Sequence, residues 1–189
     1  MAFPAHLQSL REIAMRHAVP RGTPLLLAGF IACAPVGAAP LLNVEVGPSF
    51  MNRHATAALF VESVLDERPL GSSRFSWAPD FSVGWIDGRH IRGPVEHGYT
   101  PQDTVWLAAA GVRLRVRDSA SPWHRWFFSF QPAATVGRTV ALSSGYQFVS
   151  TFGWQGERCS VQLRHVSNAG LHEPNRGETM LLFGMALRP

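Results

Sequence analysis

The stretch FSWAPDFSVGW, residues 75–85, alternates large apolar side chains with small or polar ones over its whole length. Successive side chains of an extended chain point to opposite faces, so this period of two predicts an amphipathic β-strand. The apolar face consists of Phe75, Trp77, Pro79, Phe81, Val83 and Trp85. The opposite face consists of Ser76, Ala78, Asp80, Ser82 and Gly84.

The same alternation recurs along the chain, and helical periodicity of useful length is not found. Turn signals, such as Asp-Gly at 87–88 and Ser-Pro at 121–122, separate the alternating segments. We therefore expect an all-β domain with eight antiparallel strands in up-and-down order. The strands besides 75–85 are expected at 41–47, 55–65, 112–118, 123–131, 140–148, 157–167 and 178–188.

Eight amphipathic strands can close into a barrel in two ways. A soluble barrel turns its apolar face inward, whereas an outer-membrane barrel turns it out to lipid and lines its interior with polar groups. The polar faces carry Arg113, Arg115 and Arg117, with Asp80 and Glu45 on other strands as ion-pair partners. Tryptophans also stand near strand ends, as aromatic girdles at a membrane interface require. We favour the transmembrane β-barrel of the outer-membrane type.

The N-terminal 38 residues have the pattern of a secretory signal peptide. Three arginines precede an apolar run, PLLLAGFIACAPVGAA at 24–39, which ends in small residues. We expect cleavage after Ala38, which leaves residues 39–189 as a single barrel domain. A start at Met15 would give a signal of more ordinary length, and the sequence leaves both starts open.

The charge balance and the distribution of histidines bear on whether the protein binds nucleic acid, a metal or a cofactor. The chain has 189 residues, 46% of them hydrophobic, and a formal net charge of +4. A small positive balance spread along the chain is a weak signal for nucleic acid, so we expect no nucleic-acid partner. His90 and His97 share one loop, but without a second ligand cluster they do not make a metal site. We expect neither a metal nor an organic cofactor.

The segment RHVSNAGLHEPNRGE, residues 164–178, combines a strand end with loop residues. His165 and Ser167 share a face with the apolar residues Cys159, Val161 and Leu163. In a membrane barrel this face points to lipid, where an unpaired polar group costs on the order of 1 kcal/mol or more. The pair is therefore either wetted at the head-group boundary or a serine nucleophile beside its base, directed at an acyl ester of a lipid.

This segment resembles the signature of the outer-membrane lipid A 3-O-deacylase family, PagL. The resemblance comprises His165, Ser167, Asn168, Ala169, Gly170, Leu171, Pro174, Asn175 and Gly177. It implies an eight-stranded outer-membrane barrel that hydrolyses the ester-linked 3-hydroxyacyl chain at position 3 of lipid A in the outer leaflet. It also implies that Ser167 is the nucleophile and His165 the base. The oxyanion hole would comprise the backbone N–H groups near Ala169 and Gly170 and the Asn175 amide.

The acid that would orient His165 departs from the family pattern by one residue. The pattern places it two positions after the glycine, where this chain has Thr179, and Glu178 follows Gly177 directly. A shift of one residue in a strand reverses the face of the side chain. We expect Glu178 to complete the triad through a bulge or a shorter loop. Glu173, or a dyad without an acid, are the alternatives.

Two other functions fit the same strand pattern. One is a non-catalytic outer-membrane barrel with a structural or adhesive role, for which His165 and Ser167 would be dispensable. The other is a soluble periplasmic lipid-binding barrel whose apolar face lines a cavity. The sequence fixes neither the preferred acyl length nor the oligomeric state, and a homodimer is one arrangement that it leaves open.

Overall fold

The computed structural model describes residues 40–51, 54–88 and 104–187. The expected signal peptide and the loop histidines His90 and His97 lie outside these residues. No helix among the described residues is long and apolar enough to cross a membrane. The strands are β1 (Leu41–Met51), β2 (His54–Val64), β3 (Arg68–Pro69), β4 (Phe75–Ile86), β5 (Val105–Val116), β6 (Trp126–Val136), β7 (Tyr146–Gln155), β8 (Cys159–Ser167) and β9 (Glu178–Leu187).

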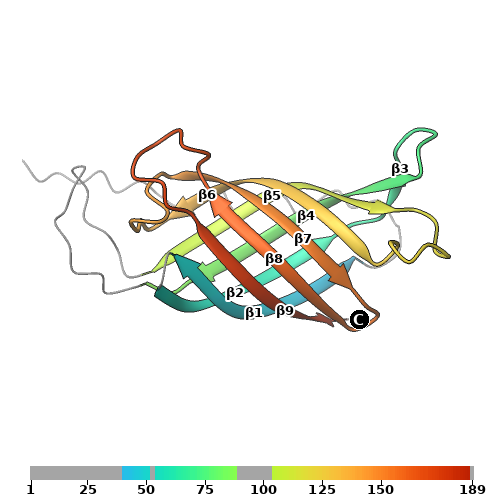
Figure 1. Cartoon of the computed structure of the whole chain (residues 1–189), viewed down its shortest axis with the longest axis horizontal. Helices are drawn as coiled ribbons and strands as arrows, with labels where there is room; N and C mark the ends of the chain where they lie inside the picture. Colours follow the sequence, from blue (N-terminus) through green and yellow to red (C-terminus); the bar gives the residue numbers. More distant parts are fainter. Residues whose placement is uncertain (1–39, 52–53, 89–103, 188–189) are drawn as a thin grey trace, which may run out of the picture. The chain divides into compact units, whose positions relative to one another are not determined.

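Eight of these strands close into an antiparallel barrel. Each long strand pairs with its neighbours in sequence order, β1 pairs with β9, and β2 pairs directly with β4. The two-residue strand β3 adds only a short pairing to β4. Figure 1 shows the strands lying side by side around the barrel wall, with β3 at one end and the loop between β8 and β9 at the other. The predicted all-β, up-and-down, eight-stranded barrel is confirmed.

The strand predicted at 140–148 is largely misplaced, and other predicted strands differ from the observed ones in their bounds. Residues 140–145 form a loop, and the strand expected at 140–148 runs instead from Tyr146 to Gln155. Ala141 and Leu142 of that loop are fully buried in the hydrophobic cluster that contains Val149 and Val166. Their apolar character therefore reflects a loop packed into the barrel rather than a strand face. The strand β5 begins seven residues before the predicted 112, and β6 begins three residues after the predicted 123.

The barrel carries its polar side chains inside and its large apolar side chains outside. Along β8, Ser160, Gln162 and Arg164 are buried while Val161 and Leu163 are exposed. The same alternation holds along the other long strands, which leave apolar side chains such as Val83, Phe128, Phe152 and Phe183 on the outer wall. This is the distribution that a membrane barrel requires, and it is the reverse of a soluble barrel that carries lipid in its interior.

A network of buried ion pairs fills the middle of the interior. Glu62 on β2 contacts both Arg113 and Arg164, and its Oε1 lies 2.9 Å from Nη2 of Arg164. Asp80 lies 3.2 Å from Arg113, and Glu45 lies 3.0 Å from Arg164. The predicted pairing of Arg113 with Asp80 is confirmed, whereas Glu45 pairs with an arginine that the sequence did not single out.

The two buried arginines also stack on aromatic rings. The guanidinium carbon of Arg113 lies 3.8 Å from the ring centre of Phe127, and that of Arg164 lies 4.4 Å from the ring centre of Phe60. Such desolvated cation–π contacts add to the ion pairs. The network joins β1, β2, β4, β5 and β8 across the barrel, so the strands are held from inside as well as by the backbone ladder.

Because Glu62 contacts both buried arginines, we expect its replacement to lower the stability of the barrel. Removing one partner of a buried charge network leaves an uncompensated charge, so Glu62→Gln should lower the free energy of unfolding by about 3 kcal/mol. The measurement is urea unfolding in detergent, followed by tryptophan fluorescence. The matched control is Glu67→Gln, whose partially exposed carboxylate pairs with Arg115 and whose loss should change stability by less than about 1 kcal/mol. Equal effects of the two variants would contradict a central role for Glu62.

Candidate active site

His165 and Ser167 lie on the outer wall, close to the end of β8. His165 is exposed and Ser167 is half-buried, whereas the residues between and beside them, Arg164 and Val166, are buried. The prediction that the histidine and the serine point the same way as Val161 and Leu163 is therefore confirmed. Both side chains are accessible to a substrate that approaches along the outside of the barrel.

A short polar row crosses three strands at the level of His165. The register places Ser150 of β7 and Thr179 of β9 directly opposite His165 on either side. Phe130 and Phe50 are the next residues of this row, on β6 and β1, and both are exposed. A group of three polar side chains is thus set between aromatic residues on an otherwise apolar wall.

Two neighbours hold the imidazole ring of His165. Its Nδ1 lies 3.0 Å from the hydroxyl oxygen of Thr179. The ring also packs on Gly177, because a β-carbon at that position would lie 2.8 Å from Cε1 and 3.2 Å from Nε2 of His165. Gly177 has φ +66°, which also favours glycine. Because Nδ1 contacts Thr179, Nε2 is the ring nitrogen that remains available. Among the described residues His165 and Ser167 share no hydrogen bond. A catalytic Ser–His hydrogen bond often forms only with substrate.

The buried side chain of Asn168 organises the loop at 168–177. Its Oδ1 accepts a hydrogen bond from the Gly170 N–H at 3.0 Å, and its Nδ2 donates to the carbonyl of His172 at 2.7 Å. The backbone N–H of Asn168 donates to Oδ1 of Asn175 at 3.3 Å. These hydrogen bonds are ordinary turn chemistry for an asparagine, and they connect the start of the loop to His172 and Asn175.

The three residues expected to supply the oxyanion hole differ in their availability. Gly170 already donates its N–H to Asn168. Asn175 uses its amide oxygen to accept from Asn168, so its NH₂ group is the part that can donate to another acceptor. Ala169 adopts φ +56°, a left-handed conformation that is strained for a residue with a β-carbon. Of the three, the N–H of Gly170 is therefore the one already engaged within the loop.

The structure does not bring Glu178 to His165. The register places Glu178 opposite Val166, so its side chain points into the barrel, where Ser49 donates to its Oε2 at 2.5 Å. The bulge that was expected to carry it outward is not formed, and the side chain follows the normal alternation of the strand. The alternative acid, Glu173, accepts a hydrogen bond from the Asn175 N–H at 3.2 Å within the loop.

The loop at 137–145 supports the loop that follows Ser167. Ala141 accepts a hydrogen bond from the Gly177 N–H at 3.1 Å, and Oγ of Ser143 lies 3.1 Å from Nδ1 of His172. Ser143 and His172 form a second Ser–His pair. Ser143 is fully buried, however, so it is poorly placed to attack a lipid and instead anchors the loop.

Sequence reasoning missed two members of the polar row, Ser150 and Thr179. Ser150 stands between apolar residues Phe148 and Phe152 on the face of β7 that points outward. A polar residue on an otherwise apolar strand face is the same pattern that singled out His165 in the sequence. Thr179 stands at the position where the family pattern has the acid, but the sequence analysis assigned it no role, and the register of β8 and β9 places it beside His165.

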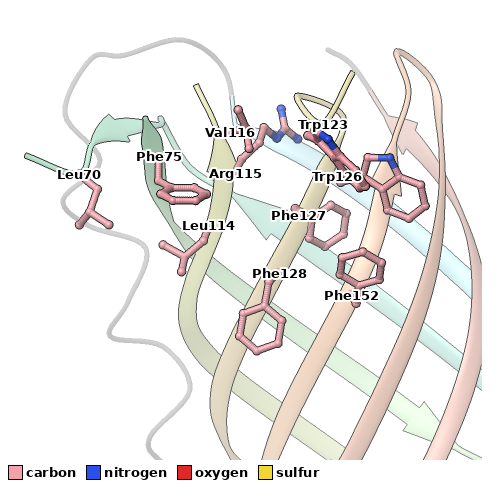
Figure 2. A pocket seen from close by; sticks show the side chains of 10 residues that line it. All are labelled: Leu70, Phe75, Leu114, Arg115, Val116, Trp123, Trp126, Phe127, Phe128 and Phe152. Atoms are coloured by element: carbon pink, nitrogen blue, oxygen red, sulfur yellow. The ribbon is translucent and has the colours of Figure 1, made fainter. Parts of the chain in front are cut away.

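An apolar pocket lies at the other end of the barrel, on the side of β3. Figure 2 shows its aromatic side chains gathered where β5 ends and β6 begins, with Trp126 stacked on Phe152 at a ring-centre distance of 5.1 Å. The lining has neither a nucleophile nor a histidine, so it suits a lipid chain or an interface girdle rather than hydrolysis. The lining residues are Leu70, Phe75, Leu114, Arg115, Val116, Trp123, Trp126, Phe127, Phe128 and Phe152. Among the described residues no cluster of three or more metal-ligating side chains occurs.

The structure is a closed β-barrel that places a histidine and a serine on the outer wall at one end. The model of the family described as lipid A 3-O-deacylase (PagL) matches residues 71–188, which is more than half of the chain. The chain therefore belongs to this family of ester-bond hydrolases, as the resemblance at 164–178 predicted. No curated protein and no solved structure matches the chain significantly.

Because Gly177 lies against the ring of His165, we expect a larger residue at position 177 to lower activity. Gly177→Ala adds a β-carbon where the imidazole ring lies, and a displacement of about 1 Å at a catalytic group can cost roughly 10²-fold in rate. The control is Gly71→Ala, which has a similar φ of +57° but open space around it. Both variants carry left-handed strain, and only Gly177→Ala should lose acyl release from purified lipid A, measured by mass spectrometry. Equal activities would show that this packing does not set the position of the ring.

Proposed function

We propose that this chain is a serine esterase that removes the 3-hydroxyacyl chain from position 3 of lipid A in the outer leaflet of the outer membrane. Ser167 is the nucleophile and His165 is the general base. The observation that carries the proposal is their common placement on the outer wall, beside the loop end of the barrel and inside the segment that matches the family. A substrate that lies in the membrane reaches this wall without entering the barrel.

Acylation begins with the attack of Ser167 Oγ on the ester carbonyl carbon. Nε2 of His165 takes the hydroxyl proton, because Nδ1 is engaged by Thr179. The carbonyl oxygen becomes an oxyanion, and the NH₂ group of Asn175 with the N–H of Ala169 stabilises it. The tetrahedral intermediate then collapses, the bond to the sugar oxygen breaks, and the imidazolium gives its proton to that oxygen.

Deacylation uses the same groups, with water as the nucleophile and the Ser167 oxygen as the leaving group. Nε2 of His165 takes a proton from a water molecule, whose oxygen attacks the acyl carbon of the Ser167 ester. Collapse of the second intermediate releases the 3-hydroxy fatty acid and returns the proton to Oγ of Ser167. Water must reach the site, and the exposed side of His165 and the polar loop at 168–177 allow this at the head-group level.

Two pairs of tryptophans support the proposed position in the membrane. Trp85 pairs across strands with Trp106 near one end of the wall, and Trp126 pairs with Trp154 near the other. Val136 stands opposite Trp106, so ten residue steps of β6 separate the two levels. At roughly 3.3 Å per residue and a tilt of about 40°, these steps span about 25 Å, the height of the apolar band of an outer-membrane barrel.

The nucleophile and the base have a direct test in single and double variants. Ser167→Ala and His165→Ala should each reduce acyl release by about 10³-fold or more, and the double variant should be no slower than either single one, since the two residues act as a unit. The measurement is release of 3-hydroxy fatty acid from purified lipid A. Each variant is first checked for an intact barrel by its mobility in unheated detergent gels.

Ser150→Ala is the matched control for this experiment. Ser150 lies on the same outer face and stands opposite His165 in the register, so it is the other hydroxyl beside the base. Its loss should leave the rate within about threefold of the wild type. If Ser150→Ala is inactive and Ser167→Ala is active, the nucleophile is Ser150. If neither variant loses activity, the serine-esterase mechanism is wrong.

The proposed location predicts the behaviour of the mature chain in cell fractions. A closed barrel with an apolar outer wall should need detergent for extraction, and in unheated gels it should migrate differently from the heat-denatured chain. Fractionation of cells that express the full chain, followed by gels with and without heating, makes both measurements. Recovery in the soluble periplasmic fraction would contradict membrane embedding.

A further inference from the structure

We infer that Thr179 is the positioning residue for His165, in the place where a triad enzyme has a carboxylate. This inference rests on the proposed function, because it gives His165 its role as the base. The observation behind it is the 3.0 Å contact between Oγ1 of Thr179 and Nδ1 of His165, on directly paired residues of β9 and β8. When Oγ1 of Thr179 accepts a hydrogen bond from Nδ1–H, the lone pair of Nε2 is left to take a proton from Ser167.

The two carboxylates that the sequence offered as the orienting acid, Glu178 and Glu173, have other hydrogen-bond partners. Glu178 points into the barrel and accepts a hydrogen bond from Ser49. Glu173 accepts from the N–H of Asn175 in the loop. A change of partner for Glu178 would require its side chain to cross the wall, since one step along a strand reverses the face. Thr179 reaches Nδ1 without any such rearrangement.

Thr179 and Gly177 together fix the ring from two sides. The hydroxyl holds Nδ1, while the backbone of Gly177 lies against Cε1 and Nε2. A carboxylate would hold the tautomer and would also stabilise the imidazolium by its charge. A hydroxyl does only the first, so this enzyme has an oriented base with weak electrostatic support for its protonated form.

Replacement of Thr179 by glutamate should therefore change the pH dependence in a defined direction. A carboxylate beside Nδ1 stabilises the imidazolium form of the His165 ring relative to its neutral form. The base is then protonated up to a higher pH, so the acidic limb of the profile of kcat/KM moves to higher pH. Among the described residues, the other titratable or charged side chains here are Arg164 and Glu178, which point inward, and His54, Arg138, Tyr146, His172, Glu173 and Arg176 at the same end of the barrel.

The experiment compares Thr179→Val, Thr179→Ser and Thr179→Glu in the full mature chain on purified lipid A. Thr179→Val has nearly the same shape and lacks the hydroxyl, so kcat should fall roughly tenfold with little change in KM. Thr179→Ser should restore the rate to within about threefold. Thr179→Glu should shift the acidic limb upward by about one pH unit.

A second measurement reports the tautomer of His165 directly. In ¹⁵N-histidine-labelled protein the His165 signals, assigned by their loss in His165→Ala, should show a proton on Nδ1 in the wild type. Thr179→Val should give a mixture of the two tautomers, which a purely structural role for the threonine would not produce.

The inference is overturned if Thr179→Val keeps both the wild-type kcat and the wild-type tautomer. It is also overturned if Glu178→Gln alters the tautomer and the pH profile while Thr179→Val does not. These results are distinct from failure of the proposed function. A Ser167→Ala variant with full activity rejects the esterase mechanism, whereas an inactive Ser167→Ala beside an unaffected Thr179→Val rejects only the role of Thr179.

Discussion

The barrel depends on the pairing of buried charges between Glu62 and the two arginines that contact it, Arg113 and Arg164. Charges inside a narrow barrel are tolerated only when each has a partner, and Glu62 is the partner that Arg113 and Arg164 share. The interior volume is taken by these side chains and by Phe60 and Phe127, which stack on the guanidinium groups. Charged, polar and aromatic side chains thus occupy the middle of the described interior, and the outer wall carries the exposed large apolar side chains.

The outer wall in turn explains the unusual position of the candidate site. His165 is separated from Arg164 by one step along β8, and that step takes the chain from the buried network to the outer surface. The packing that holds Arg164 therefore also fixes the height and direction of β8, and with it the direction of His165. Polar residues on an apolar wall are unfavourable, and here they are gathered into one row, Ser150, His165 and Thr179, between phenylalanines.

Alternation along the strands was sufficient to predict the barrel and the outward direction of His165 and Ser167. It failed at 140–148, where Ala141 and Leu142 are apolar because their loop packs into the barrel. It also missed the first half of β5, whose run of small residues shows little alternation. The expectation that Glu178 would lie beside His165 failed, although the family pattern already has its acid at the position of Thr179. The neighbour of His165 depends on the pairing of β9 with β8, where a single step of register places Thr179 and not Glu178 beside the ring.

The contacts between the loops at 137–145 and 168–177 have a consequence for the evolution and engineering of this scaffold. The first loop supplies the carbonyl of Ala141 and the hydroxyl of Ser143, and the second supplies the N–H of Gly177 and the ring of His172. The two loops are thus held together by hydrogen bonds and form one structural unit. A graft that moves 168–177 onto another eight-stranded barrel would transfer the residues of the site without the neighbour that shapes them, so a working transplant has to carry both loops together.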